Sequence, residues 1–106
     1  MADAESLMAE MRSRADALRS LGYRVRFDLM DTEESILLDA TGGGTPSIEV
    51  ASQDDEADTV FRLSAADAEK LMAGKLSPML AFSTGRLRVE GSKGVAMKLA
   101  SLLDED

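Results

Sequence analysis

The spacing of the apolar side chains changes abruptly at Gly22, and this change restricts the folds that the chain can adopt. Over residues 4–21, apolar side chains recur at steps of three and four, as on one face of a helix: Leu7, Met8, Met11, Ala15, Leu18 and Leu21. Over residues 23–29, apolar and polar residues alternate, which is typical of a half-buried strand. We therefore expect a helix over 4–21 that ends at Gly22 and leads directly into the first strand of a sheet.

The same alternation continues further along the chain and predicts three more strands. They cover residues 36–41, 48–50 and 58–63, and the turn-rich links between the strands are short: 31–34, 42–46 and 53–56. Because a parallel pair of strands requires a crossover of about a dozen residues, links this short favour antiparallel pairing. The sequence therefore predicts a four-stranded antiparallel meander over residues 23 to 63.

Serine caps divide the last third of the chain into two helices, a strand and a final helix. The helices begin after Ser64, Ser77 and Ser92, and residues 86–90 predict the fifth strand. The expected order is α-β-β-β-β-α-α-β-α, an α+β fold in which helices cover a five-stranded, mainly antiparallel sheet. With 106 residues, we expect a single domain over residues 1–106.

The sequence contains no cysteine and no histidine, which excludes much of the common catalytic repertoire. Disulfides, thiolate nucleophiles, Cys/His zinc sites and the Ser-His-Asp triad are all ruled out. Acidic runs such as Glu33-Glu34 and Asp54-Asp55-Glu56 lack the alternating ligands and central glycine of a calcium loop. We therefore expect no metal, no cofactor and no enzymatic turnover.

The charge balance is acidic, with 12 basic and 20 acidic residues and a formal net charge of −8. Binding to nucleic acid requires a positive surface, so this balance argues against a nucleic-acid partner. From Phe27 through Phe61 there are ten acidic residues and no basic ones. This stretch is interpreted either as solvated surface or as an acidic docking surface for a partner protein.

The beginning of the sequence, Met-Ala-Asp-Ala-Glu, carries acidic residues where a signal peptide would be positive. No apolar run approaches the ~20 residues that a membrane-spanning helix needs. We therefore expect a cytoplasmic protein that does not insert into a membrane, with transient membrane contact left open.

Apolar residues gather between Leu71 and Phe82, where Gly74 and Pro78 interrupt the predicted helices. Seven methionines and no tryptophan make the interior soft, and methionine recurs on surfaces that accept varied apolar partners. One interpretation of this cluster is the packing of an ordinary core. Alternatively, the two short helices cover a cavity that admits an apolar ligand.

Between residues 57 and 103, glycines are spaced around a middle helix that contains an aromatic residue. The segments are ADTVFRLS (57–64), LMAGKLSPMLAF (71–82), GRLRVEG (85–91) and VAMKL (95–99). This pattern resembles the sterol carrier protein type 2 (SCP2) family, and the preceding helix and strands agree with it in order.

The resemblance implies a five-stranded sheet whose helices enclose an apolar tunnel for sterols, fatty acids or fatty acyl-CoA. Such a protein binds or transfers a lipid by burying it rather than by chemistry. We expect eight residues to line the tunnel: Leu71, Met72, Leu76, Met79, Phe82, Leu99, Leu102 and Leu103. The tunnel mouth is expected at five of them: Leu76, Met79 and Phe82, with Leu99 and Leu102 on the facing helix.

Two other functions are also compatible with the sequence. One is a protein-interaction or accessory module with a filled core, which docks through its acidic segment 28–58. The other is an accessory domain of a lipid-modifying enzyme that is encoded separately. A lipid carrier and an interaction module differ in whether the interior contains empty volume.

Overall fold

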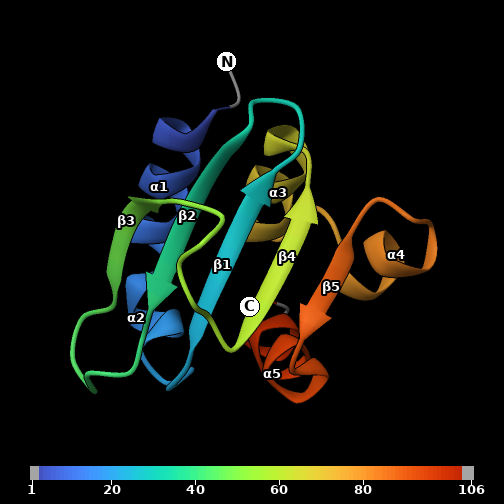
Figure 1. The fold of residues 1–106 in the computed structure, drawn as a ribbon. Coiled ribbons are helices and arrows are strands. Elements are labelled where there is room, and N and C mark those ends of the chain that lie inside the picture. Colours follow the sequence, from blue (N-terminus) through green and yellow to red (C-terminus); the bar gives the residue numbers. More distant parts are fainter. Residues whose placement is uncertain (1–2, 104–106) are drawn as a thin grey trace.

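A five-stranded sheet forms the centre of the computed structural model, which describes residues 3–103 (Figure 1). The strands are β1 (Arg24–Leu29), β2 (Glu34–Asp39), β3 (Ser47–Ala51), β4 (Thr59–Leu63) and β5 (Arg88–Gly91). The helices are α1 (Ala4–Ser13), α2 (Ala15–Leu18), α3 (Ala65–Met72), α4 (Pro78–Ser83) and α5 (Lys93–Leu103). The predicted α+β class and order of elements are confirmed, except that the first helix has two parts. None of the helices within 3–103 is long and apolar enough to span a membrane.

The helix predicted over 4–21 is divided at Arg14, whose backbone leaves the helical conformation (φ −107°, ψ 13°). The two parts contact different neighbours, since α1 packs against α3, β2 and β3 whereas α2 contacts α5. Both still bury the apolar stripe that the sequence shows, including Leu7, Met11 and Leu18. The apolar spacing runs through the division unchanged, so the pattern did not reveal it.

The strands lie in the order β3-β2-β1-β4-β5, which corrects the predicted antiparallel meander over 23–63. β1, β2 and β3 pair in antiparallel fashion as expected. β4, however, pairs with β1, and the two strands are parallel. β5 then adds to the other side of β4 in antiparallel orientation. The sheet is therefore mainly antiparallel with one central parallel pair.

Residues 52–58 make this parallel pairing possible by crossing the open face of the sheet from β3 to β4 (Figure 1). An extended chain reaches roughly 3.3 Å per residue and strands lie about 4.8 Å apart, so seven residues suffice without a helix. The Arg26 guanidinium donates to the carbonyl oxygen of Asp55 (2.8 Å), and the Arg24 backbone N–H donates to Oδ2 of Asp58 (2.9 Å). The prediction of an antiparallel meander was wrong because it assumed that a crossover needs about a dozen residues. The anchored link makes the crossover with seven.

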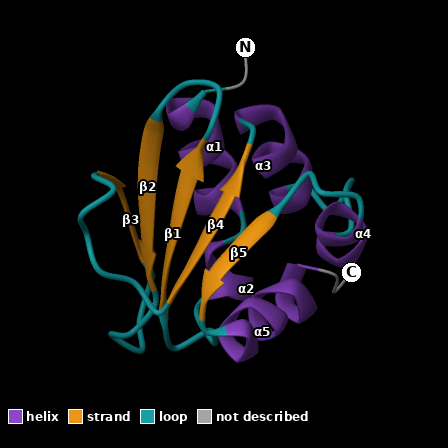
Figure 2. Ribbon diagram, turned by 45° about the vertical axis from the view of Figure 1, so that its right-hand side comes forward, coloured by secondary structure: helices purple, strands orange, loops and turns teal. Residues whose placement is uncertain are grey.

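The hydrophobic core lies between the sheet and the helices, which gather on one side of it (Figure 2). Side chains such as Phe27, Ile36 and Leu38 point from the strands into this core and are fully buried. The rings of Phe27 and Phe61 meet edge to face with their centroids 5.4 Å apart, a favoured aromatic geometry. These two rings connect β1 and β4 at the centre of the parallel pair.

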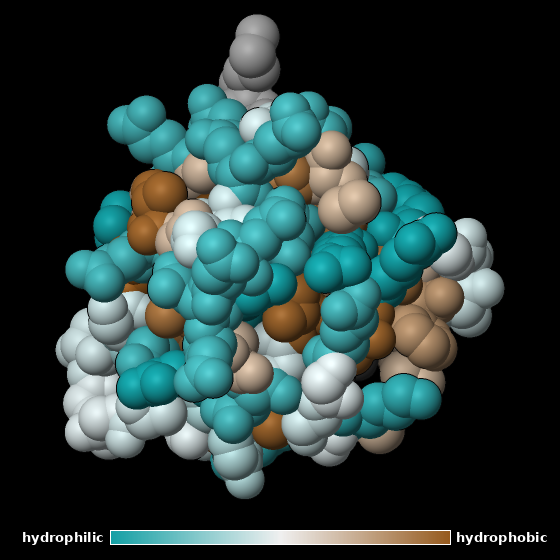
Figure 3. All heavy atoms as spheres, in the orientation of Figure 1, coloured by the Kyte–Doolittle hydropathy of each residue, from teal (hydrophilic) through white to brown (hydrophobic). Residues whose placement is uncertain are grey.

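The opposite face of the sheet carries a buried polar network, and most of the surface on this side is hydrophilic (Figure 3). Asp28 accepts hydrogen bonds from Arg26 (2.9 Å) and Ser35 (2.8 Å), and a longer one from Arg62 (3.4 Å). Only 2% of Asp28 is exposed. Burial acts to raise the pKa of Asp28, but the hydrogen bonds from Arg26 and Ser35 outweigh it, and the pKa lies below its ordinary value. Asp28 is therefore an ionised part of the fold.

Candidate functional site

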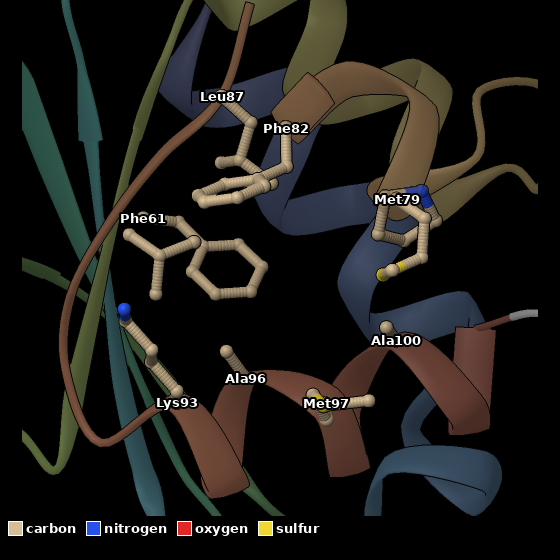
Figure 4. Close-up of a pocket in the computed structure, with 10 residues that line it drawn as sticks. Phe61, Met79, Phe82, Leu87, Lys93, Ala96, Met97 and Ala100 are labelled. Atoms are coloured by element: carbon tan, nitrogen blue, oxygen red, sulfur yellow. The ribbon is translucent and has the colours of Figure 1, made fainter. Parts of the chain in front are cut away.

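An apolar groove lies between α4, β5 and α5, with a cavity volume of about 170 Å³ (Figure 4). Nine of its ten lining residues are apolar, and the tenth is a lysine. The groove is defined by Phe61, Pro78, Met79, Phe82, Leu87, Val89, Lys93, Ala96, Met97 and Ala100. Figure 4 shows that these side chains come from facing elements and point into a shared space. An apolar concave site of this kind suits a hydrophobic ligand.

Helix α4 forms one wall of the groove and is only six residues long. The Ser77 hydroxyl caps it by accepting a hydrogen bond from the Leu80 backbone N–H (3.5 Å), and Pro78 occupies its first turn. Gly85, with φ +80°, ends the turn that follows. Met79 is 62% exposed and Phe82 is 51% exposed. α4 is therefore a short helix with much of its apolar surface outside the core.

Helix α5 forms the facing wall, with one side toward the core and another toward the groove. Its buried residues, including Val95, Leu99 and Leu103, point into the core. Its groove-lining residues follow the spacing of a second helical face: Lys93, Ala96, Met97 and Ala100. The Ser92 hydroxyl accepts a hydrogen bond from the Val95 backbone N–H (3.2 Å) and fixes the start of the helix. One helix thus closes the core and borders the groove.

Gly91 places α5 correctly after β5. Its φ is +86°, and a side chain there would lie 2.7 Å from the Asp58 carbonyl oxygen. The same carbonyl oxygen accepts a hydrogen bond from the Ser92 backbone N–H (2.9 Å). Only glycine fits this close approach without displacement of the backbone. The link that brings β4 beside β1 therefore also holds the end of β5.

The structure brings two of the eight predicted tunnel residues, Met79 and Phe82, into the groove. Leu102 is partly buried against the core, and five residues lie within it: Leu71, Met72, Leu76, Leu99 and Leu103. The expected mouth is divided in the same way, since Leu76 and Leu99 are buried in the core whereas Met79 and Phe82 line the groove. A lining role for these six residues stays a prediction that requires the interior to open.

Sequence reasoning missed the groove face of α5. Met97 lies on the far side of α5 from its core face, and that side borders the groove. The available signal was the pair of small residues Ala96 and Ala100, which leave space beside Met97 at helical spacing. Lys93 gives no signal for a binding site in the sequence, because a lysine at the start of a helix is normally solvated.

A second, larger and polar hollow of about 620 Å³ lies beneath the 52–58 link, beside Arg24 and Arg26. Its charged groups serve the fold, since the Arg26 guanidinium contacts Asp28 and Asp55. Within residues 3–103, no group of three or more acidic side chains is placed to hold a metal ion. This hollow offers no apolar surface comparable with that of the groove.

Many carboxylates of the acidic segment 28–58 form hydrogen bonds within the fold. Besides Asp28, five of its carboxylates accept hydrogen bonds from described partners: Asp31 from Ala65, Glu34 from Ala4, Asp39 from Thr41, Asp55 from Ser52 and Asp58 from Arg24. The hydrogen bonds from Thr41 also lower the pKa of Asp39 below its ordinary value. These contacts explain much of the acidic run without a partner protein.

Comparison with known sequences gives a family match over nearly all of the chain. Residues 4–104 match the sequence model of the SCP-2 sterol transfer family. Hydroxysteroid dehydrogenase-like protein 2 of Homo sapiens is 28% identical over 117 residues, which cover 95% of this chain and 28% of that protein. The protein of the same name from Bos taurus is 38% identical over 64 residues, covering 60% of this chain and 14% of that protein. The chain thus spans a minor part of these relatives.

Solved structures share the fold at low sequence identity. Sterol carrier protein 2 of Yarrowia lipolytica superposes with a TM-score of 0.65 and 23% identity, covering 90% of this chain and 77% of that one. Sterol carrier protein 2-like 2 of Aedes aegypti gives a TM-score of 0.74 and 14% identity, covering 92% and 93%. The palmitated form of that protein gives 0.72 and 15%, covering 95% and 94%.

Proposed function

Because the chain belongs to the SCP-2 sterol transfer family, we propose that the groove holds one apolar ligand without covalent bonding. Family and fold support the binding or transfer of lipids or sterols in general. The ligand that we propose is a fatty acid, a fatty acyl-CoA or a sterol-like lipid. The single domain 1–106 carries it in the cytoplasm. The observation that supports it most is the groove, whose lining is apolar at nine of ten positions.

Burial of hydrocarbon supplies the binding energy in this proposal. Each methylene group removed from water contributes about 0.8 kcal/mol. Ten buried methylenes contribute roughly 8 kcal/mol, which must offset several kcal/mol of lost ligand freedom. A long acyl chain therefore binds usefully, whereas a chain of four or five carbons does not.

The groove must widen to accept such a chain. Its volume of about 170 Å³ is smaller than the roughly 300–1,000 Å³ of typical small-molecule sites. α4 is the element that can yield, because a helix this short depends on packing and its apolar side chains are half exposed. Outward movement of α4 exposes Leu76, which directly precedes it, and the core residues behind it. The predicted mouth and tunnel residues then line one continuous space.

A fatty acid is supported by one structural neighbour, because the Aedes aegypti protein of the same fold is described in a palmitated form. Domains of this family are generally lipid carriers rather than enzymes. The dehydrogenase-like names belong to much longer proteins, of which this chain matches 28% or less. We therefore propose transport or presentation of the ligand, with no turnover by this chain.

Charge placed inside the groove tests the proposal. We expect wild-type protein to bind a fluorescent fatty acid saturably at micromolar concentration. Met79→Glu or Phe82→Glu should weaken binding at least about tenfold, because an unpaired carboxylate in an apolar site is costly. Leu80→Glu is the matched control, since Leu80 is exposed on α4 (56%) but does not line the groove.

Thermal unfolding of each variant shows whether the fold is retained. An equal loss of affinity in the Leu80 variant and the two groove variants would place the ligand elsewhere. Wild-type protein that is folded and shows no saturable binding would contradict the proposal.

A further inference from the structure

One charged side chain borders the apolar groove, that of Lys93 at the first position of α5. Figure 4 shows its aliphatic stem extending from α5 toward β5, with the nitrogen at the opposite end of the lining from Met79. The stem contributes apolar surface while the ammonium group stays at the rim. The groove therefore has a cationic end and an apolar end.

No carboxylate neutralises this ammonium group within residues 3–103, where Lys93 forms no ion pair. Segment 64–103 contains six basic residues and three acidic ones. All three carboxylates have partners elsewhere: Asp67 with Arg86, Glu69 with Ser6 and Glu90 with Arg62. The charge of Lys93 is thus available to a ligand.

The surroundings of the groove differ in charge from the molecule as a whole. The net charge is −8, and ten acidic residues without a basic one lie between Phe27 and Phe61. Segment 64–103, which supplies nine of the ten lining residues, has an excess of basic residues instead. A region with an excess of basic residues attracts anions locally, even in a protein whose net charge is negative.

We infer that Lys93 selects ligands with an anionic head group, a carboxylate or a phosphate, at the end of a single hydrocarbon chain. This inference rests on the proposed function and specifies it further. The ammonium group pairs with the head group at the β5 side, and the chain extends past Ala96 toward Met79. The ion pair forms beside apolar surface, where electrostatic attraction is screened less than in open solvent. A sterol, whose polar group is one neutral hydroxyl, gains no such ion pair.

Two probes of equal length test this inference, a fluorescent fatty acid and the alcohol with the same chain and fluorophore. We expect wild-type protein to bind the acid about five- to tenfold more tightly at low salt. Lys93→Met should remove this preference by weakening acid binding alone, whereas Lys93→Arg should retain it. Lys98→Met is the matched control, because it removes the same charge from the same helix outside the groove, where Lys98 lies over the Tyr23 ring (5.4 Å).

The outcomes separate this inference from the proposed function. Equal affinity of wild-type protein for both probes, or equal effects of Lys93→Met and Lys98→Met, would overturn the role of Lys93 and leave a groove that binds neutral lipids. Failure of both probes to bind would overturn the proposed function and the inference together.

Discussion

Asp28 belongs to the acidic segment 28–58, but it is buried and stabilises the fold instead of contributing to a docking surface. It lies on the face of the sheet away from the helices, where Arg26 and Ser35 donate to its carboxylate. Arg26 continues the network to the carbonyl oxygen of Asp55 in the link that crosses the sheet. The parallel pairing of β1 and β4 therefore depends on a buried ion pair at its centre.

Asp28→Asn should destabilise the protein by about 2–4 kcal/mol at pH 7, because it leaves Arg26 buried without its charged partner. The folded-state pKa of Asp28 lies below its ordinary value, so its contribution is present above the unfolded pKa of about 3.9 and is lost as the pH falls through the folded pKa. Urea unfolding from pH 7 to pH 3 should show the two proteins converging as the pH falls. A difference that stays constant with pH would contradict this role.

Among the elements, α3 and α5 follow from the sequence and α4 does so only in part. Ser64 and Ser92 each cap a helix as predicted, because a side-chain oxygen at that position satisfies a free backbone N–H. α4 also begins after Ser77 as expected. Its apolar residues gave no indication of which of them contact the core and which border a groove. That division depends on the packing of β5 and α5, which lie later in the chain.

The groove residues of α5 were beyond prediction for a related reason. Apolar spacing identifies the side of a helix with the largest side chains, and on α5 that side faces the core. Ala96 and Ala100 are small, so their side of the helix carries a weak signal although it leaves space for a ligand. The predicted tunnel residues are therefore mostly core residues behind the groove.

α4 should open more readily than the sheet, because it has six residues and buries only Pro78 and Ala81. We expect the amide of Ala81, which donates to the Ser77 carbonyl oxygen, to exchange hydrogen much faster than amides of β1. Addition of a saturating fatty acid should slow exchange in α4 more than in α3, the nearby helix used as a control. Equal protection of α4 and β1 without ligand would contradict an opening at this helix.

At the scale of the whole molecule, the sequence allowed the α+β class, the element order and the family to be predicted. The strand order was predicted wrongly because pairing was argued from the length of the links. The expected link, 53–56, is too short for a crossover, whereas the observed link, 52–58, is longer and is anchored across the sheet by Arg24 and Arg26. Contacts of this kind join residues about thirty positions apart, and local patterns do not report them.

The distribution of methionines allows the central claim, an apolar ligand in the groove, to be tested across the molecule. Met79 and Met97 line the groove, Met11 and Met72 lie in the core, and Met30 is exposed outside the groove. Their methyl groups report on all three regions in one nuclear magnetic resonance spectrum. We expect a titrated fatty acid to shift the signals of Met79 and Met97 most, with a smaller change at Met72 as α4 moves. Shifts confined to Met30, or no saturable shift at Met79 and Met97, would contradict binding in the groove.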